Sequence, residues 1–400
     1  MKRYDLITPE GTRDLLFEDC LARKDVENRL EKLFKGFGYS EVVTPGIEFY
    51  DVFSSSARGF RQESLYKLTD SKGRLIVMRP DSTLPIARLV ATRLKDSKLP
   101  LRLFYNQSLY ENNSLLKGRS DEMVQAGVEL IGSASVKRGD YEVLCLGVQS
   151  LKEFDDNFRL EIGHIGYFKA LVDKLGVDKM VEEEIRMLIS AKNYPALNDL
   201  LDTIGDNKII RTLKQLPRLF GGVEVFDKAA ELFTDDKIDG ILVNLREVYN
   251  RLSSLGYEGK ISVDLGIVSH IDYYTGIVFK GYISGVGSAV LKGGRYDKLI
   301  GEFGRDVNAV GFGVNVDAVA NYMRKKGASP EIKIPDAVVF GKTGYVVEAV
   351  AYAQKLCNEG MTVENGLFDT LEETVAYAKE KGINKIYVVD KEIKEVCCNE

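Results

Sequence analysis

The stretch that decides the fold spans residues 102–132 and reads RLFYNQSLYENNSLLKGRSDEMVQAGVELIG. Its two ends are rich in apolar and aromatic residues, whereas its middle is polar. This pattern predicts two strands, at 101–110 and 124–131, joined by a polar loop. We expect the two strands to belong to one antiparallel sheet.

The second of these strands has two chemically different faces. Valine, alanine and leucine occupy one face, while Gln125 and Glu129 lie on the other, because side chains alternate along a strand. An amide and a carboxylate two strand steps apart suit a small polar ligand with an amine or a ring N–H. The same pattern fits a face that is simply solvated, so the sequence leaves both interpretations open.

The chain on either side of this pair predicts an α+β core. Apolar residues at helical spacing predict helices within 15–38 and 139–155, and Ser82 is placed to cap a third helix. From about 169 to 254 the sequence is helical and charged, without strand alternation. We therefore expect an antiparallel sheet interrupted by a helical insertion, with further strands at 261–266, 274–283, 289–291 and 309–314.

The end of the chain predicts a separate small domain. After the sequence KKGASP at 325–330, predicted strands and helices alternate. This rhythm is typical of a small α/β domain with a largely parallel sheet. The expected organisation is a core at 1–326 with its insertion at 169–254, a linker at 327–333 and an α/β domain at 334–400.

Composition excludes several classes of protein. The 400 residues contain 55 Lys+Arg and 60 Asp+Glu, a net charge of −5, which argues against a general, charge-driven nucleic-acid binder. We find no signal sequence and no apolar run of about 18 residues, as a membrane span would need. The five cysteines are scattered and indicate reduced thiols. We expect a cytoplasmic protein that does not engage a membrane and has no metal site.

Several short motifs are ordinary when each is taken alone. Gly341-Lys342-Thr343 ends like a phosphate-binding loop, but the glycine required five positions earlier is Asp336. Residues 272–276, DYYTG, have the character of a strand edge, and residues 293–297, GGRYD, that of a tight turn. A lone histidine at a strand entrance, such as His270, is more often structural than catalytic.

Taken together and in order, five segments resemble the histidyl-tRNA synthetase family, a class II synthetase. The resemblance covers roughly the first 320 residues and implies that family's antiparallel core. The C-terminal α/β segment at 334–400 looks like that family's anticodon-binding domain, but shortened. The five matching segments are TPEGTRD at 8–14, RPDSTLPIAR at 79–88, the stretch 102–132, IDYYTGIVFKGY at 271–282, and GGRYDKLI with AVGFGV within 293–314.

The resemblance fails at the positions where the family handles ATP. Three expected arginines are replaced by Glu111, Ser269 and Ala318. Adenylyl transfer needs fixed positive charge on the phosphates. Glu111 would place a negative charge against the phosphates of ATP. Such a like-charge contact costs about 4 kcal/mol at an effective dielectric constant near 20. We therefore predict that aminoacylation activity is absent.

The amino-acid pocket, by contrast, is retained. The resemblance implies that carboxylate and amide groups hold the α-amino group of the ligand, and that Glu129 and Tyr274 contact its imidazole ring. No catalytic residue and no cofactor is implied. The candidate histidine-binding residues are Asp81, Thr83, Gln125, Glu129, Tyr273 and Tyr274.

This combination resembles the regulatory subunits of ATP phosphoribosyltransferase, synthetase paralogues of histidine biosynthesis. It implies a non-catalytic chain that is required by a short-form catalytic subunit and takes part in feedback regulation by histidine. The implied assembly is a homodimer within a hetero-octamer, and tRNA binding is not expected. Two alternatives remain open: an active histidyl-tRNA ligase and a stand-alone histidine sensor with another partner.

Overall fold

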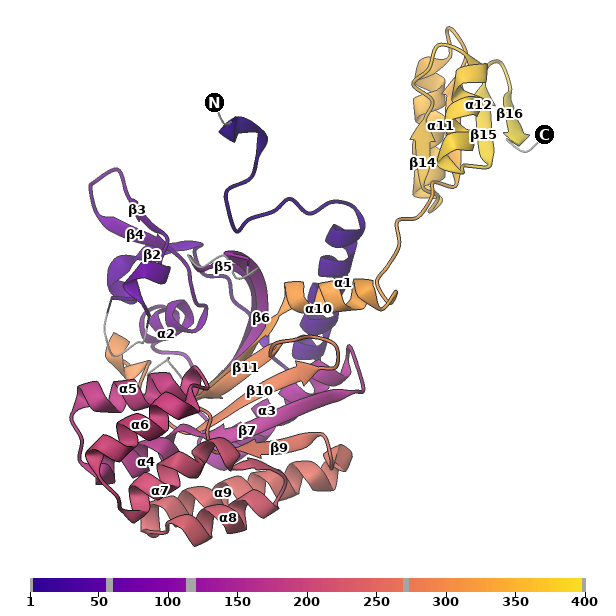
Figure 1. Cartoon of the computed structure of the whole chain (residues 1–400). Helices are drawn as coiled ribbons and strands as arrows, with labels where there is room; N and C mark the ends of the chain where they lie inside the picture. Colours follow the sequence, from indigo (N-terminus) through magenta and orange to yellow (C-terminus); the bar gives the residue numbers. More distant parts are fainter. Residues whose placement is uncertain (1–2, 55–59, 113–119, 269–272, 398–400) are drawn as a thin grey trace. The chain divides into compact units, whose positions relative to one another are not determined.

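The computed structural model describes residues 3–54, 60–112, 120–268 and 273–397 (Figure 1). The chain divides into two compact units, Met1–Pro330 and Glu331–Glu400, hereafter unit 1 and unit 2. Within the described ranges, no helix is both long and apolar enough to cross a lipid bilayer.

Unit 1 is organised around one large sheet, which has nine strands in the described part of the chain. Their order is β1-β5-β6-β12-β11-β10-β7-β9-β8. Neighbouring strands are antiparallel except for β1 with β5 and β7 with β9. The bounds are β1 Ser40–Glu41, β5 Leu101–Tyr110, β6 Glu122–Ile131, β7 Phe158–His164, β8 Phe220–Gly221, β9 Ile261–Asp264, β10 Ile277–Ile283, β11 Leu291–Arg295 and β12 Ala309–Asn315.

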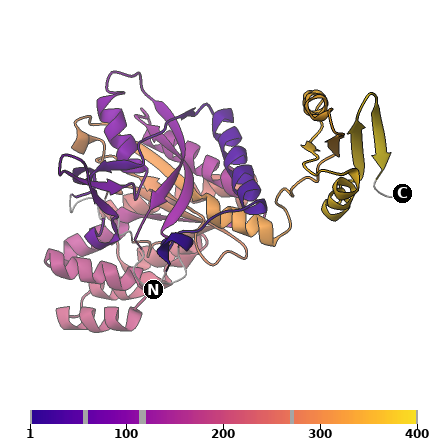
Figure 2. The same ribbon diagram turned by 90° about the horizontal axis from the view of Figure 1, so that it is seen from above.

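One face of this sheet is covered by three helices: α1 (Glu18–Gly36), α3 (Val136–Lys152) and α10 (Val316–Lys325). Figures 1 and 2 both place α1 beside α10. Helix α1 buries Val26, Leu30 and Phe34, which recur every four residues and therefore form one apolar stripe. This stripe packs into the main hydrophobic core of unit 1.

The opposite face of the sheet is bordered by helix α2 (Thr83–Thr92) and a small sheet. The small sheet has the order β2-β4-β3, with β2 Ile47–Phe49, β3 Lys67–Thr69 and β4 Leu75–Met78. Ser82 precedes α2, but its hydroxyl accepts from Gln107 Nε2 at 2.8 Å and does not cap the helix. Ser82 is the N-cap residue by position, but the side chain that accepts the Leu84 N–H, at 2.9 Å, is that of the preceding residue, Asp81.

The insertion begins earlier than predicted and is not purely helical. It starts at Ile165, directly after β7, and contains the two-residue strand β8, which pairs with β9. Four of its helices begin at an Asp or Asn whose side chain accepts a backbone N–H, which satisfies the free donors of the first turn. The helices are α4 Ile165–Leu175, α5 Lys179–Ser190, α6 Tyr194–Ile204, α7 Lys208–Gln215, α8 Glu224–Leu232 and α9 Asp236–Leu252.

Several sheet assignments of unit 1 differ from the sequence-based expectation, and neither β2 nor β8 was predicted. Strand β7 was not predicted, although it lies between β10 and β9 in the sheet. Residues 293–297 were expected to form a tight turn, yet Gly293 and Gly294 belong to strand β11. Glycine is unusual inside a strand and marks a place where another group approaches the backbone closely.

Unit 2 is a four-stranded α/β sheet with the order β14-β13-β15-β16 in its described residues. Strand β13 is parallel to β14 and β15, as the alternating rhythm predicted, while β16 was not predicted and is antiparallel to β15. The elements are β13 Ala337–Gly341, α11 Val346–Asn358, β14 Val363–Asn365, α12 Leu371–Lys381, β15 Lys385–Val389 and β16 Ile393–Cys397.

Candidate functional site

Glu129 lies at the centre of the site. It projects from the inner strand β6, between β5 and β12, and is only 1% exposed, so this face is not solvated at that position. Its Oε1 accepts the Thr83 hydroxyl at 2.9 Å, and its Oε2 accepts the hydroxyl of Tyr296. Burial raises the pKa of Glu129 to about 8, although these two hydrogen bonds favour the ionised form.

Asp81 and the two tyrosines form the second part of the site. Tyr273 donates a hydrogen bond to the Asp81 carboxylate. The Tyr273 ring lies 5.0 Å from that of Tyr274 and 5.8 Å from that of Tyr296, measured between centroids. Burial raises the pKa of Asp81 to about 6. The Asp81 charge in turn raises the pKa of Glu129, so the two carboxyl groups resist being ionised together.

Gln125 is the last of the six predicted residues. It lies on β6, two residues before Gly127. Its Oε1 accepts the hydroxyl of Tyr105 at 2.8 Å. Tyr105 comes from the neighbouring strand β5, where it lies opposite Gly127. A chain of contacts thus joins five of the predicted residues around Glu129 and Asp81, and Gln125 lies on the same face of β6 as Glu129.

Glycines beneath these side chains make the arrangement possible. A Cβ atom at Gly311 would lie 1.8 Å from Glu129 Oε2, and one at Gly313 would lie 2.4 Å from Cδ of Gln125. Likewise, a Cβ at Gly294 would lie 2.8 Å from the Tyr274 ring. The glycines of β11 and β12 therefore leave room for functional side chains to lie flat on the sheet.

Sequence reasoning missed Tyr105 and Tyr296 as members of the site. Both are buried, and they donate to Gln125 and Glu129, respectively. A signal for Tyr296 was present, because it lies in the GGRYD segment that we interpreted as a turn. Placing the segment on β11 is what brings Tyr296 over Glu129.

Two of the three residues that replace the expected arginines, Glu111 and Ala318, are described by the structure. The third, Ser269, lies outside the described residues, and so does His270. Glu111 follows the end of β5 and is exposed. Ala318 lies in the first turn of α10, beside Asp317. The Asp317 carboxylate forms an ion pair with Arg23, at 2.7 Å, and accepts a hydrogen bond from the Val124 N–H, at 2.7 Å.

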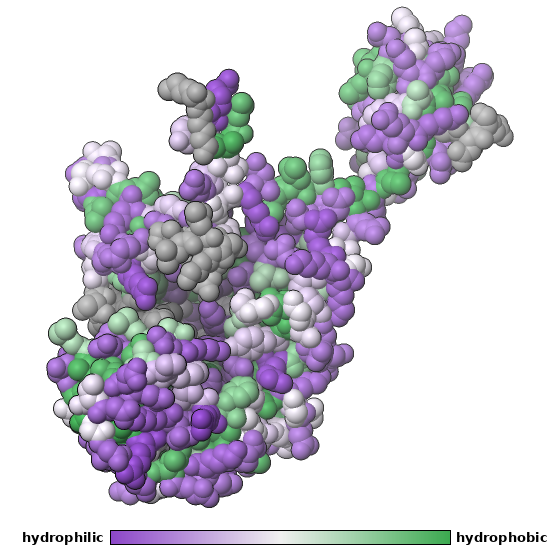
Figure 3. All heavy atoms as spheres, viewed as in Figure 1, coloured by the Kyte–Doolittle hydropathy of each residue, from purple (hydrophilic) through white to green (hydrophobic). Residues whose placement is uncertain are grey.

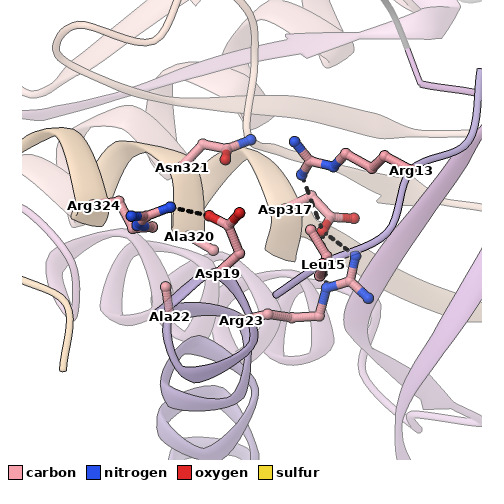
Figure 4. Close-up of a pocket in the computed structure, with 9 residues that line it drawn as sticks. All are labelled: Arg13, Leu15, Asp19, Ala22, Arg23, Asp317, Ala320, Asn321 and Arg324. Atoms are coloured by element: carbon pink, nitrogen blue, oxygen red, sulfur yellow. Dashed lines mark hydrogen bonds and ion pairs between the residues drawn. The ribbon is translucent and has the colours of Figure 1, made fainter. Parts of the chain in front are cut away.

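Figure 4 shows a small pocket that is lined by Asp317, the residue that precedes Ala318. Arg13 and Arg23 both point toward Asp317, and Arg324 pairs with Asp19. The guanidinium groups of this pocket are thus directed at carboxylates of the same chain. Three arginines against two aspartates give this pocket a formal charge of +1, and all three guanidinium groups are paired within the chain.

Two further arginines of the matching segments are structural. Buried Arg79 donates to the carbonyls of Thr44, Pro45 and Ser108. Arg295 pairs with Asp140 at 2.7 Å and with Asp297 at 2.8 Å. Each side chain directs its N–H groups to protein oxygens, so neither guanidinium is left free to bind a phosphate.

The site is chemically suited to bind rather than to transform a ligand. Buried carboxyl, amide and phenol groups can hold an ammonium or an imidazole N–H. Among the described residues, no group of three or more His, Cys, Asp or Glu side chains is arranged to hold a metal ion.

Comparisons with known proteins agree with this picture. The family profile described as histidyl-tRNA synthetase matches residues 11–319. The ATP phosphoribosyltransferase regulatory subunit of Clostridium kluyveri is 40% identical over 96% of this chain and 99% of its own length. That of Clostridium acetobutylicum is 38% identical over 98% of this chain and 96% of its own length.

Solved structures give the same fold. A crystal structure from Bacillus halodurans, described as an ATP phosphoribosyltransferase regulatory subunit/histidyl-tRNA synthetase, matches with a TM-score of 0.82 and 30% identity, over 95% of this chain and 97% of that chain. A histidyl-tRNA synthetase from Nostoc matches with a TM-score of 0.76 at 18% identity, over 99% and 98% of the two chains, which supports the class II fold alone. The chain therefore belongs to the family of ATP phosphoribosyltransferase regulatory subunits, which has the histidyl-tRNA synthetase fold.

Proposed function

We propose that this chain is the non-catalytic regulatory subunit of a short-form ATP phosphoribosyltransferase, and that it binds histidine in the site around Glu129. The names of its relatives, at close to full length, support the first part. One observation supports the second part: Glu129, Thr83, Asp81 and Tyr273 form a buried, hydrogen-bonded cluster, while Glu111 and Ala318 supply no positive charge for ATP.

In this proposal the chain has no turnover of its own. It forms a homodimer, docks transferase subunits within a hetero-octamer in the cytoplasm, and shifts them toward an active arrangement. Histidine changes that equilibrium only if it binds the two arrangements with different affinities. The ligand's ammonium group would face Asp81 and Glu129, since these are the carboxyl groups of the cluster.

The raised pKa of Glu129 gives histidine binding a measurable signature. At pH 7 a carboxyl with a pKa of about 8 is mostly protonated. A ligand cation beside it lowers that pKa and drives the proton into solution. Binding should therefore release up to about 0.9 proton per site near pH 7.

The experiment is calorimetric titration of the purified chain with L-histidine, in two buffers that differ in ionisation enthalpy. The expected result is binding with proton release, lost in Glu129→Gln and kept in Glu122→Gln. Glu122 is a matched control because it is a partly buried glutamate at the other end of β6. Binding that is equal in Glu129→Gln would contradict the assignment of this site.

The regulatory role is tested separately with a purified short-form transferase. Its activity should rise when this chain is added, and the mass of the complex should give the stoichiometry. A transferase that is indifferent to the chain would favour the stand-alone sensor. ATP–pyrophosphate exchange that depends on histidine would instead support the ligase.

A further inference from the structure

Tyr296 is held in a fixed position beside Glu129. It follows strand β11, and its N–H donates to the Ala309 carbonyl at 2.8 Å, which continues the pairing of β11 with β12. It is 2% exposed, and its ring packs edge-to-face against that of Tyr273, with centroids 5.8 Å apart. The preceding residue, Arg295, is anchored by two ion pairs. The backbone and the ring thus leave the Tyr296 hydroxyl little freedom to move.

The two carboxylate oxygens of Glu129 have different surroundings. Oε2 accepts the Tyr296 hydroxyl and occupies the space that a side chain at Gly311 would need, since a Cβ there would lie 1.8 Å from it. Oε1 accepts the Thr83 hydroxyl at 2.9 Å, and this hydroxyl also interacts with that of Tyr273, one of the candidate ligand contacts. Oε1 therefore faces the groups to which the proposed function assigns the ligand, whereas Oε2 is enclosed by protein.

The hydroxyl donors decide which oxygen of Glu129 faces the ligand, because the terminal torsion of a glutamate has only broad preferences. The Thr83 hydroxyl uses one lone pair of Oε1 and leaves another for an N–H donor. On Oε2 the hydrogen bond from Tyr296 also stabilises the negative charge, since hydrogen bonds to an ionised acceptor are stronger than neutral ones. The Tyr296 hydroxyl thus fixes the orientation of Glu129 and favours its ionised form.

We propose that Tyr296 is the positioning residue of the histidine site: its hydroxyl anchors Oε2 of Glu129 over Gly311, so that Oε1 accepts an N–H of the ligand. This rests on the proposed function. Tyr296 acts through Glu129 and does not itself have to contact histidine.

The same hydroxyl gives the site a pH dependence that can be measured. Burial raises the pKa of Glu129 to about 8, and the hydrogen bond from Tyr296 opposes this rise more than any other contact. Removing the hydroxyl should raise that pKa further, so that fewer sites are ionised at neutral pH. Burial also raises the pKa of each phenol around Glu129, so these groups stay neutral up to pH 8.5. The titratable groups that act on Glu129 in the described structure are Asp81 before α2, Tyr39 before β1, Tyr105 on β5, Tyr273 and Tyr274 before β10, and Tyr296 after β11.

The test is Tyr296→Phe, which removes the hydroxyl and keeps the ring. In calorimetric titrations with L-histidine, this variant should bind about 10-fold more weakly than the wild-type chain at pH 7 and about 3-fold more weakly at pH 8.5. Losing one hydrogen bond to a charged group lowers the ratio of ionised to protonated Glu129 by about 10-fold, and this loss matters less as pH rises past the pKa. The titration of histidine itself cancels in the comparison.

Tyr167→Phe is the matched control. Tyr167 lies in α4, is 0% exposed, and its hydroxyl has no hydrogen-bond partner among the residues that the structure describes. The visible outer surface of the insertion is mostly hydrophilic (Figure 3), and its helices turn their apolar sides, this ring included, toward the main core. Tyr167→Phe should therefore bind histidine like the wild-type chain at both pH values.

A second measurement needs no ligand. Glu129 can take up a proton when it loses the donor on Oε2, so we expect Tyr296→Phe to fold, which circular dichroism checks. Its free energy of unfolding in urea should still fall between about pH 8 and about pH 9, where that of the wild-type chain levels off.

The outcomes separate this inference from the proposed function. If the affinity of Tyr296→Phe falls by the same factor at both pH values, or does not fall, the positioning role of Tyr296 is overturned and the histidine site stands. A wild-type chain that does not bind histidine would overturn both.

Discussion

Replacing Glu129 with glutamine should remove a pH dependence from the stability of the protein. The folded chain raises the pKa of Glu129 from 4.5 to about 8, chiefly through burial. Between those values the folded state holds a proton that the unfolded state has lost. Unfolding is therefore favoured as pH rises, and stability falls through this interval before levelling off above about pH 8.

The magnitude follows from the size of the shift. Each pKa unit corresponds to about 1.4 kcal/mol, so the interval from 4.5 to about 8 amounts to about 5 kcal/mol for a group that is 1% exposed. The window from about pH 6.5 to about pH 8.5 contains about 2 kcal/mol of this loss. That window also lies above the pKa of Asp81, about 6, and the pKa of His164, which burial lowers to about 4.

Urea denaturation followed by circular dichroism measures the effect, because the chain contains no tryptophan for fluorescence. The wild-type chain should lose about 2 kcal/mol of unfolding free energy between the two pH values, while Glu129→Gln loses less than half as much. A glutamine can still accept from Thr83 and donate to Tyr296. The difference between the two proteins cancels groups that titrate in both. Equal losses in both proteins would refute the buried, protonated state of Glu129.

Two further substitutions test the geometry of the site and its frame. Gly311→Ala should abolish histidine binding, because its Cβ would lie 1.8 Å from Glu129 Oε2, whereas Gly240→Ala, with nothing within 4 Å, should leave calorimetric binding unchanged. Arg295→Met should lower the free energy of unfolding by about 3–5 kcal/mol in urea denaturation, because it leaves the buried carboxylate of Asp140 without its ion-pair partner. Adding Asp140→Asn should recover much of that loss, and an undiminished loss in the double variant would contradict the pairing.

Much of the site could be predicted from local sequence. The alternation of β6 placed Gln125 and Glu129 on one face and the aliphatic residues on the other, and the structure confirms that separation. Strands β5 and β6 follow one another in the chain with only a loop between them. They pair antiparallel, as predicted. The α+β class and the synthetase-like core are likewise confirmed.

Other features depend on contacts between distant segments. The Asp81 side chain accepts the Leu84 N–H and Ser82 instead meets Gln107, because β5 lies against the start of α2. Strand β7 became recognisable only through its pairing with β10, which follows it by more than a hundred residues. Local propensity contains no information about such partners.

The sequence by itself determined which chemical groups the site contains: acids, an amide and phenols, without the arginines expected at positions 111, 269 and 318. Only the tertiary structure decided how those groups are used. Tyr296 reaches Glu129 because Gly294 and Gly311 are register partners on β11 and β12, with Glu129 next on β6. Burial by these strands, which are far apart in the sequence, raises the pKa of Glu129, since desolvation depends on everything that surrounds a group and not on its neighbours in the chain.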